Sequence, residues 1–107
     1  MQNSTTPRMK QLQQMLEKQP RDAFLLYGMA LELKKAQDLQ KALEYLHRVI
    51  EVDPGYGYAF YQMGQIHEQR GEVDSAKQSY RDGIEAAGRS GDSHAQSELQ
   101  TALTMLE

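Results

Sequence analysis

Residues of the same kind recur in this chain at an interval of 34 positions. Pro20 and Pro54 lie 34 residues apart, and a further 34 residues lead to Gly88. The same shift superimposes aromatic, sulfur-containing and small residues on residues of their own class. These pairs are Tyr27 and Tyr61, Met29 and Met63, Ala42 and Ala76, and Ala30 and Gly64. A fixed period of this length is typical of repeat proteins, in which each repeat is one supersecondary unit that packs against its neighbours.

Each repeat has the sequence pattern of two helices. Nowhere do apolar and polar residues alternate over a β-branched run, so no strand is expected. Thr6 and Pro7 offer a capping hydroxyl followed by proline at the first helical position, and Asp22 can cap the next helix. Further helices are expected over about 23–35, 40–52 and 73–87.

The remaining boundaries follow from glycines and a capping pattern. A helix from near Tyr58 should end at Gly71, because glycine suits the left-handed conformation of a helix C-terminus. Residues 88–92, Gly-Arg-Ser-Gly-Asp, are interpreted as a flexible link. Ser93 and Gln96 then have the spacing of a capping box that opens a sixth helix.

A 34-residue helix–turn–helix unit resembles the tetratricopeptide repeat, whose pattern is W-x₂-L-G-x₂-Y…A-x₃-F…P. The second copy reads Phe60-x₂-Met63-Gly64-x₂-His67, then Ala76-x₃-Tyr80, with Gly88 at the proline position. The first copy reads Leu26-x₂-Met29-Ala30-x₂-Leu33, then Ala42-x₃-Leu46 and Pro54. The resemblance covers residues from about 8 to 88. Its departures include Leu26 for Trp, Ala30 for Gly, His67 for Tyr, and Gln37 where the next copy has Gly71.

The resemblance implies an all-α fold, a short right-handed superhelical array of antiparallel helix pairs with about six helices. We expect a single domain over 1–107. Its parts are a half-repeat helix at 7–19, repeats at 23–56 and 57–90, and a C-terminal capping helix at 92–107. Gly83 lies in the middle of an expected helix, where glycine costs about 1 kcal/mol relative to alanine. It therefore predicts close packing, here against the last helix.

The composition argues against several classes of function. The chain has no cysteine, which excludes a disulfide framework, a thiolate nucleophile and a cysteine-based zinc site. It carries 12 basic and 15 acidic residues for a net charge of −3, without a basic run, so nucleic acid is not expected as a partner. Neither a signal-peptide core nor a stretch of membrane-spanning length is found, so we expect no membrane association and a cytoplasmic location.

Motifs of catalysis and metal binding are absent from the sequence. His47, His67 and His94 lie on three different expected helices, and no HExxH, GxSxG, GxGxxG or P-loop pattern occurs. His67 stands where the repeat has a packing aromatic, which favours a structural role. We therefore predict that the protein is not an enzyme and uses no cofactor or metal.

The first helix of each repeat has two distinct faces on a helical wheel. In the second copy, Phe60, Met63, Gly64 and His67 form the signature face, and the opposite face carries other aromatic and amide residues. In tetratricopeptide arrays the face opposite the signature lines a concave groove. The resemblance thus places Phe24, Tyr27, Leu31, Tyr58 and Tyr61 in a groove, bordered by Lys35, Gln62, Gln65 and Gln69.

The predicted function is a non-catalytic adaptor or scaffold that binds a peptide or helix of a partner protein. Aromatic rings supply contact area at low entropic cost, and glutamine amides can pair with a peptide backbone. Some family members hold a C-terminal carboxylate in a clamp that begins where Tyr27 and Tyr61 stand. Because Leu31 and Gln65 replace its Asn, we predict no such clamp.

Three interpretations of the aromatic face remain open at this point. It can bind a partner, it can form a homodimer or another self-assembly, or it can be buried inside the protein under the last helix. An RNA-binding helical repeat fits less well, since the groove offers little basic charge beyond Lys35.

Overall fold

The computed structural model describes residues 5–107, which fold into six α-helices without a strand. The first four residues of the expected domain lie outside this range. The helices are α1 (Pro7–Lys18), α2 (Ala23–Lys35), α3 (Leu39–Val52), α4 (Gly57–Gln69), α5 (Val73–Ser90) and α6 (Ser93–Leu106). The all-α class predicted from the repeat pattern is confirmed.

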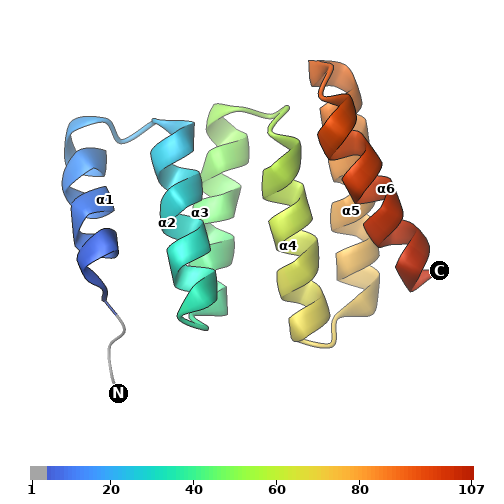
Figure 1. The fold of residues 1–107 in the computed structure, drawn as a ribbon, viewed down its shortest axis with the longest axis horizontal. Coiled ribbons are helices and arrows are strands. Elements are labelled where there is room, and N and C mark those ends of the chain that lie inside the picture. Colours follow the sequence, from blue (N-terminus) through green and yellow to red (C-terminus); the bar gives the residue numbers. More distant parts are fainter. Residues whose placement is uncertain (1–4) are drawn as a thin grey trace. The chain divides into compact units, whose positions relative to one another are not determined.

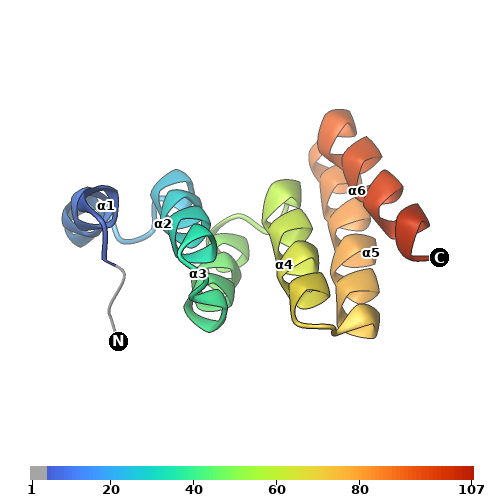
Figure 2. The same cartoon turned by 60° about the horizontal axis from the view of Figure 1, so that its bottom comes forward.

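The described chain divides into two compact units. Unit 1 ends at Val52 and contains α1, α2 and α3, whereas unit 2 covers Asp53–Glu107 and contains α4, α5 and α6. In unit 1, α2 and α3 form an antiparallel pair and α1 lies against α2 (Figure 1). In unit 2, α4 pairs with α5, and α6 packs on α5 and also contacts α4 (Figure 2). Each unit therefore holds one helix pair of the kind that the repeat predicts, and one further helix.

Side-chain caps start three of the helices. The hydroxyl of Thr6 and the carboxylate of Asp22 each accept a hydrogen bond from the backbone N–H three residues further on, both at 3.1 Å. Pro7 occupies the first turn of α1, where its missing N–H costs nothing. The capping role predicted for Ser93 is wrong, because Asp92 accepts the corresponding bond at the start of α6, at 3.0 Å. Carboxylate and hydroxyl caps both satisfy an N–H that has no partner within the helix.

The turn inside each helix pair contains one residue in the left-handed conformation. Gln37 has a φ of 65° between α2 and α3, and Gly71 has a φ of 74° between α4 and α5. The next residues, Asp38 and Glu72, each donate a backbone N–H to the carbonyl five residues earlier, at 2.9 and 2.8 Å. This bond satisfies a carbonyl of the last helical turn. The prediction for Gly71 is confirmed, and Gln37 makes the same turn despite its side chain.

The flexible link expected over residues 88–92 is wrong. α5 continues to Ser90 and ends at Gly91, whose φ is 76°. Proline at the equivalent position, Pro54, lacks an N–H and disfavours helical geometry in the residue before it. Gly88 keeps its N–H and costs only about 1 kcal/mol inside a helix, so the helix passes through it.

Gly88 also allows a close approach of α6. A Cβ at Gly88 would lie 2.8 Å from Nε2 of Gln96. That amide donates a hydrogen bond to the backbone carbonyl of Ile84, at 3.2 Å. Gln96, the expected partner in the capping box, thus ties α6 to α5.

The core of unit 1 consists of the residues that carry the repeat signature together with apolar residues of α1. Each of the signature residues is at most 7% exposed. They are Leu26, Met29, Ala30, Leu33, Ala42 and Leu46. Met9, Leu12 and Leu16 of α1 are buried as well. The large and small side chains of the signature therefore do what the pattern predicts, which is to fill the space between neighbouring helices.

The core of unit 2 is built around two glycines. Tyr80 is fully buried and lies across Gly64, where a Cβ would be 2.6 Å from Cδ1 of the ring and nearer still to Cε1. At Gly83 a Cβ would lie 2.6 Å from Cβ of Phe60 and 2.9 Å from Cδ2 of Leu99. The close packing predicted at Gly83 is confirmed, and it involves α4 as well as α6.

Candidate functional site

Clustered metal ligands are not found in the part of the chain that the structure describes, where no group of three or more His, Cys, Asp or Glu could hold an ion. Over the same residues, every helix is too short or too polar to cross a membrane.

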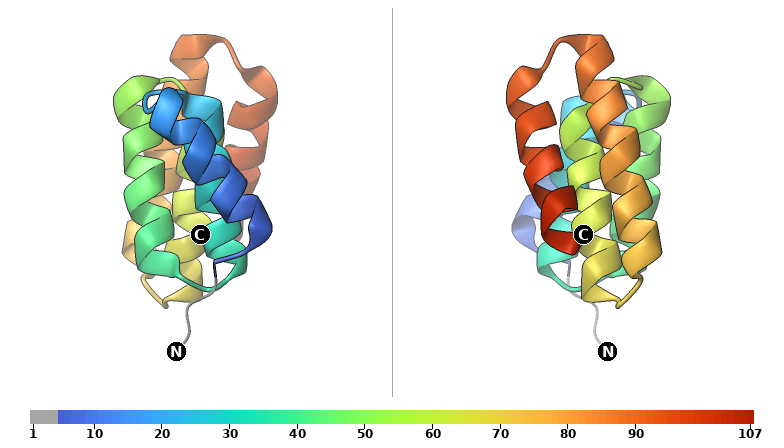
Figure 3. Two further views of the ribbon diagram at one scale, coloured as in Figure 1. Left: turned by 90° about the vertical axis from the view of Figure 1, so that its left-hand side faces the viewer. Right: turned by 90° about the vertical axis from the view of Figure 1, so that its right-hand side faces the viewer.

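Unit 2 contains a cleft of about 360 Å³ between α4, α5 and α6. The right-hand view of Figure 3 shows α5 and α6 in front and α4 behind them. The residues that line the cleft are Tyr61, Gln65, Glu68, Tyr80, Ser97, Glu98, Thr101, Ala102 and Met105. Two of the predicted groove residues, Tyr61 and Gln65, are among them. Met105 is 81% exposed, so the lining of the cleft includes an apolar side chain that is open to solvent.

Glu98 of α6 holds the predicted groove residue Tyr58 in place. The Tyr58 hydroxyl donates a hydrogen bond to Oε2 of Glu98 at 2.7 Å, and Nε2 of His94 lies 2.7 Å from the same oxygen. The rings of Tyr58 and Tyr61 meet edge to face, with centroids 6.4 Å apart. Both tyrosines are half-buried and pack against the core of unit 2. The last helix thus covers part of this aromatic face and leaves the cleft beside it.

On the other side of the cleft, Glu68 of α4 accepts a short hydrogen bond from the hydroxyl of Tyr80. Burial of the ring, followed by this bond and the charge of Glu68, raises the pKa of Tyr80 well above its usual value. The Tyr61 ring lies 6.1 Å from that of Tyr80, and its hydroxyl accepts a hydrogen bond from Nε2 of Gln65 at 3.0 Å. The cleft wall is therefore a connected network of rings, amide and carboxylates with defined orientations.

Of the other predicted groove residues of α4, Gln69 lies near this cleft. Gln69 lines a neighbouring hollow of about 270 Å³ together with Gln65 and Glu68. Gln62 is half-buried on the same helix. The structure thus groups Tyr58, Tyr61, Gln65 and Gln69 around one part of unit 2. Their role in binding stays a prediction.

The four predicted groove residues of unit 1 differ in exposure. Phe24 is 72% exposed and Lys35 is exposed, whereas Tyr27 and Leu31 are half-buried. A Cβ at Gly28 would lie 3.5 Å from Cδ2 of Leu12 in α1, so α1 contacts α2 close to these groove residues.

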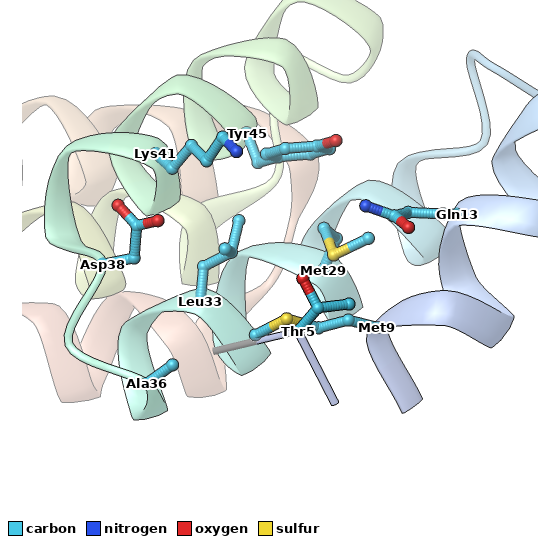
Figure 4. Close-up of a pocket in the computed structure, with 9 residues that line it drawn as sticks. All are labelled: Thr5, Met9, Gln13, Met29, Leu33, Ala36, Asp38, Lys41 and Tyr45. Carbon is cyan, nitrogen blue, oxygen red and sulfur yellow. The ribbon is translucent and has the colours of Figure 1, made fainter. Parts of the chain in front are cut away.

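A second, much smaller cavity of about 60 Å³ lies in unit 1. Figure 4 shows Met9 and Gln13 of α1 on one side and Lys41 and Tyr45 of α3 on the other. None of the predicted groove residues lines it. A cavity of this size has room for a few water molecules and no room for a peptide. The cleft between α4, α5 and α6 is therefore a stronger candidate site than this cavity.

Sequence reasoning missed several residues of the cleft. Glu68 lies three residues after Gln65 and so shares its side of α4, a spacing from which it could have been found. Glu98, Thr101 and Met105 lie on α6, where the apolar stripe indicated which side packs inward but not what the other side contacts. Their place in the cleft depends on how α6 packs, which no local pattern shows.

Comparisons with known proteins agree with this architecture. The profile of the tetratricopeptide repeat matches residues 33–106. A TPR repeat-containing protein of Pseudomonas aeruginosa is 30% identical over 96 residues, which cover 90% of this chain and 91% of that protein. The solution structure of a tetratricopeptide repeat domain protein from Salinibacter ruber superimposes with a TM-score of 0.76 at 34% identity. This match covers 82% of this chain and 89% of that one.

A more distant structure extends the likeness of fold. The crystal structure of PcrH in complex with the chaperone binding region of PopD matches with a TM-score of 0.83, covering 92% of this chain and 74% of that one. At 15% identity this likeness concerns the fold alone. Together, the period of 34 residues, the packed signature positions, the profile match and the Pseudomonas relative lead to one conclusion: this chain belongs to the tetratricopeptide repeat family.

Proposed function

We propose that the chain is a non-catalytic protein-interaction module, and that the cleft between α4, α5 and α6 binds a segment of a partner protein. The tetratricopeptide fold itself suggests a scaffold for protein–protein interaction, and the family is generally non-enzymatic. The observation that carries the proposal is the cleft of about 360 Å³, which combines the exposed Met105 with the fixed Tyr61 and Gln65. An apolar contact beside oriented polar groups is the usual composition of a recognition site.

The contacts of the cleft wall favour a receptor that is largely preformed. The hydrogen bonds of Tyr58, Tyr80 and Gln65 restrain their side chains before any partner arrives. Binding then loses less side-chain entropy on the receptor side, and more of the contact energy remains as affinity. PcrH, which shares the fold, is seen with a region of another protein, PopD. That precedent supports the idea that a scaffold of this architecture holds a protein segment.

A matched pair of substitutions tests the proposal. Met105 and Val73 are both exposed apolar residues of unit 2, but only Met105 lines the cleft. Twelve-residue peptides are first selected on the wild-type protein from a random display library. Their affinities are then measured by fluorescence anisotropy for wild type, Met105→Arg and Val73→Arg. We expect Met105→Arg to abolish binding and Val73→Arg to leave it unchanged. Peptides that bind both variants equally would show that the cleft is not the site.

Self-assembly through the same aromatic face is the competing function. Light scattering of the purified protein at high concentration distinguishes the two. A monomer is expected if the cleft serves a partner. A dimer that Tyr58→Ala plus Tyr61→Ala dissociates would replace partner binding by homodimerisation.

A further inference from the structure

The cleft of unit 2 has a charge of one sign. Among its lining residues, Glu68 and Glu98 carry negative charge at neutral pH, and none of the others is Lys, Arg or His. One basic group, His94, contacts a lining residue: its Nε2 lies 2.7 Å from Oε2 of Glu98. Its side chain is 80% exposed, outside the set that lines the cleft. A bound segment therefore meets carboxylates on both α4 and α6.

Each carboxylate is positioned by a tyrosine. The hydroxyl of Tyr80 donates a hydrogen bond to Oε2 of Glu68, and the hydroxyl of Tyr58 donates one to Oε2 of Glu98. These contacts involve Oε2 of each glutamate, and a carboxylate has a second oxygen that can accept a donor from a ligand. Carboxylates held in this way accept charge-assisted hydrogen bonds without first losing rotamer freedom.

The surface next to the carboxylates is apolar. Tyr61 presents an aromatic ring, and Ala102 and Met105 add aliphatic contact from α6. A long basic side chain suits such a surface, because its methylene stem packs on apolar groups while its charged end reaches an acceptor. Aromatic rings near a carboxylate also attract a cation through their quadrupole.

From this complementarity we propose that the cleft recognises a lysine or arginine in an extended segment of a partner protein, with an apolar residue beside it that contacts Met105. The inference deepens the proposed function and rests on it. The basic side chain inserts between α4 and α6 and donates to Glu98 and Glu68, and the neighbouring apolar side chain covers the exposed thioether. A segment that ends in its own carboxylate at this place is repelled, the same outcome as the sequence prediction that the protein has no carboxylate clamp.

The experiment uses three pools of fluorescein-labelled nonapeptides with identical randomised flanks. Their central residue is lysine or arginine in the first pool, glutamate in the second and leucine in the third. Binding to the full chain is followed by fluorescence anisotropy. The variants are Glu98→Gln and Glu68→Gln, which keep an oxygen to accept from the tyrosine. Glu85→Gln is the matched control, since it removes the same charge from an exposed position on α5 outside the cleft.

The basic pool should bind best, and each cleft variant should weaken that binding about tenfold, the effect expected for one lost charge-assisted hydrogen bond. Glu85→Gln should change it less than twofold, and thermal unfolding by circular dichroism should show all three variants folded. If the leucine or glutamate pool binds best and Met105→Arg still abolishes that binding, this inference fails and the proposed function stands. If no pool binds, or Met105→Arg has no effect on binding, both fail.

Discussion

Two equivalent positions of the repeat carry different side chains in the two helix pairs. Unit 1 has Ala30 on α2 and Leu46 on α3, whereas unit 2 has Gly64 on α4 and Tyr80 on α5, and all four are buried. A smaller residue on the first helix thus accompanies a larger one on the second, as close packing requires. The difference has a consequence at the surface, because only the tyrosine carries a hydroxyl, and it binds Glu68 at the edge of the cleft. Unit 2 thereby connects its core to its candidate site.

The largest effect is expected from Gly64→Ala, which enlarges the small residue that makes room for the ring of Tyr80. The new Cβ would lie well inside van der Waals contact with the ring of Tyr80. We expect a loss of about 3 kcal/mol in the free energy of unfolding, at the upper end of the usual cost of overpacking. The mirror substitution Ala30→Gly should cost only about 1 kcal/mol, the ordinary price of glycine in a helix. Urea unfolding followed by circular dichroism measures both.

The double variant Gly64→Ala plus Tyr80→Leu sharpens the test, because it gives unit 2 the residues of unit 1. It should recover a large part of the stability lost in Gly64→Ala alone. If the double variant is less stable than the single one, the two positions are not compensating in volume. Unchanged stability of Gly64→Ala would show that Tyr80 does not lie across Gly64.

Tyr80→Phe removes only the hydroxyl that distinguishes unit 2. We expect it to cost about 1.5 kcal/mol, because a hydrogen bond to a charged acceptor is lost from a buried ring. The pKa of Tyr80 is raised in the folded state, first by burial and then by Glu68. The contribution of a raised pKa is complete below the ordinary tyrosine pKa of about 10 and is lost as pH rises above it. Stability measured by urea unfolding from pH 8 to 11 should therefore fall less steeply in Tyr80→Phe. Equal slopes would argue against the shifted pKa.

The turns provide a smaller contrast between the units. Gln37 and Gly71 adopt nearly the same left-handed φ, 65° and 74°, and only glycine does so without steric cost. Gln37→Gly should stabilise the protein, and Gly71→Gln should destabilise it, each by about 1 kcal/mol. Thermal unfolding midpoints check the two signs. A destabilised Gln37→Gly would mean that the weak bond from the Gln37 side chain to the carbonyl of Lys34, at 3.4 Å, matters more than the backbone conformation.

The helices and their packed faces were predictable because their signals are local or periodic. Thr6 and Asp22 cap by a bond over three residues, and Pro54 acts on the residue before it, so each can be read from a short stretch. The prediction that the helix ends at Gly88 is wrong because glycine permits a helix end without enforcing one. In the structure α5 passes through Gly88, and the residue packed against Gly88 is Gln96 of another helix, a contact that no local pattern shows.

The candidate site was predictable only in part, for the same reason. Tyr61 and Gln65 follow from the wheel of one helix and the period of the repeat. Glu98 and Met105 belong to α6, which departs from the 34-residue register, so no equivalent position indicates what they face. The signature position of Tyr80 is typical of a packed residue, and Tyr80 is buried, yet its hydroxyl also reaches a cleft residue. A residue with two roles of this kind has no separate signature in the sequence.

The smallest expected effect concerns the turn after α4, where His67 and Glu72 replace Leu33 and Asp38 of unit 1. Nδ1 of His67 lies 2.7 Å from Oε1 of Glu72. The pKa of Glu72 is lowered, chiefly by the hydrogen bond with His67; burial opposes this effect, and the charges of Arg70 and His67 add to the lowering. A lowered pKa contributes stability that is complete above the unfolded-state value, about 4.3 for glutamate, and is lost as pH falls through the folded value. His67→Leu, which copies unit 1, should therefore differ in pH dependence from wild type mainly on the acid side. Urea unfolding from pH 6 to 3 measures the gap in the free energy of unfolding between wild type and His67→Leu. As pH falls, wild type should lose more of this free energy than His67→Leu does. A gap that stays constant over this range would mean that the pair makes no electrostatic contribution to the turn.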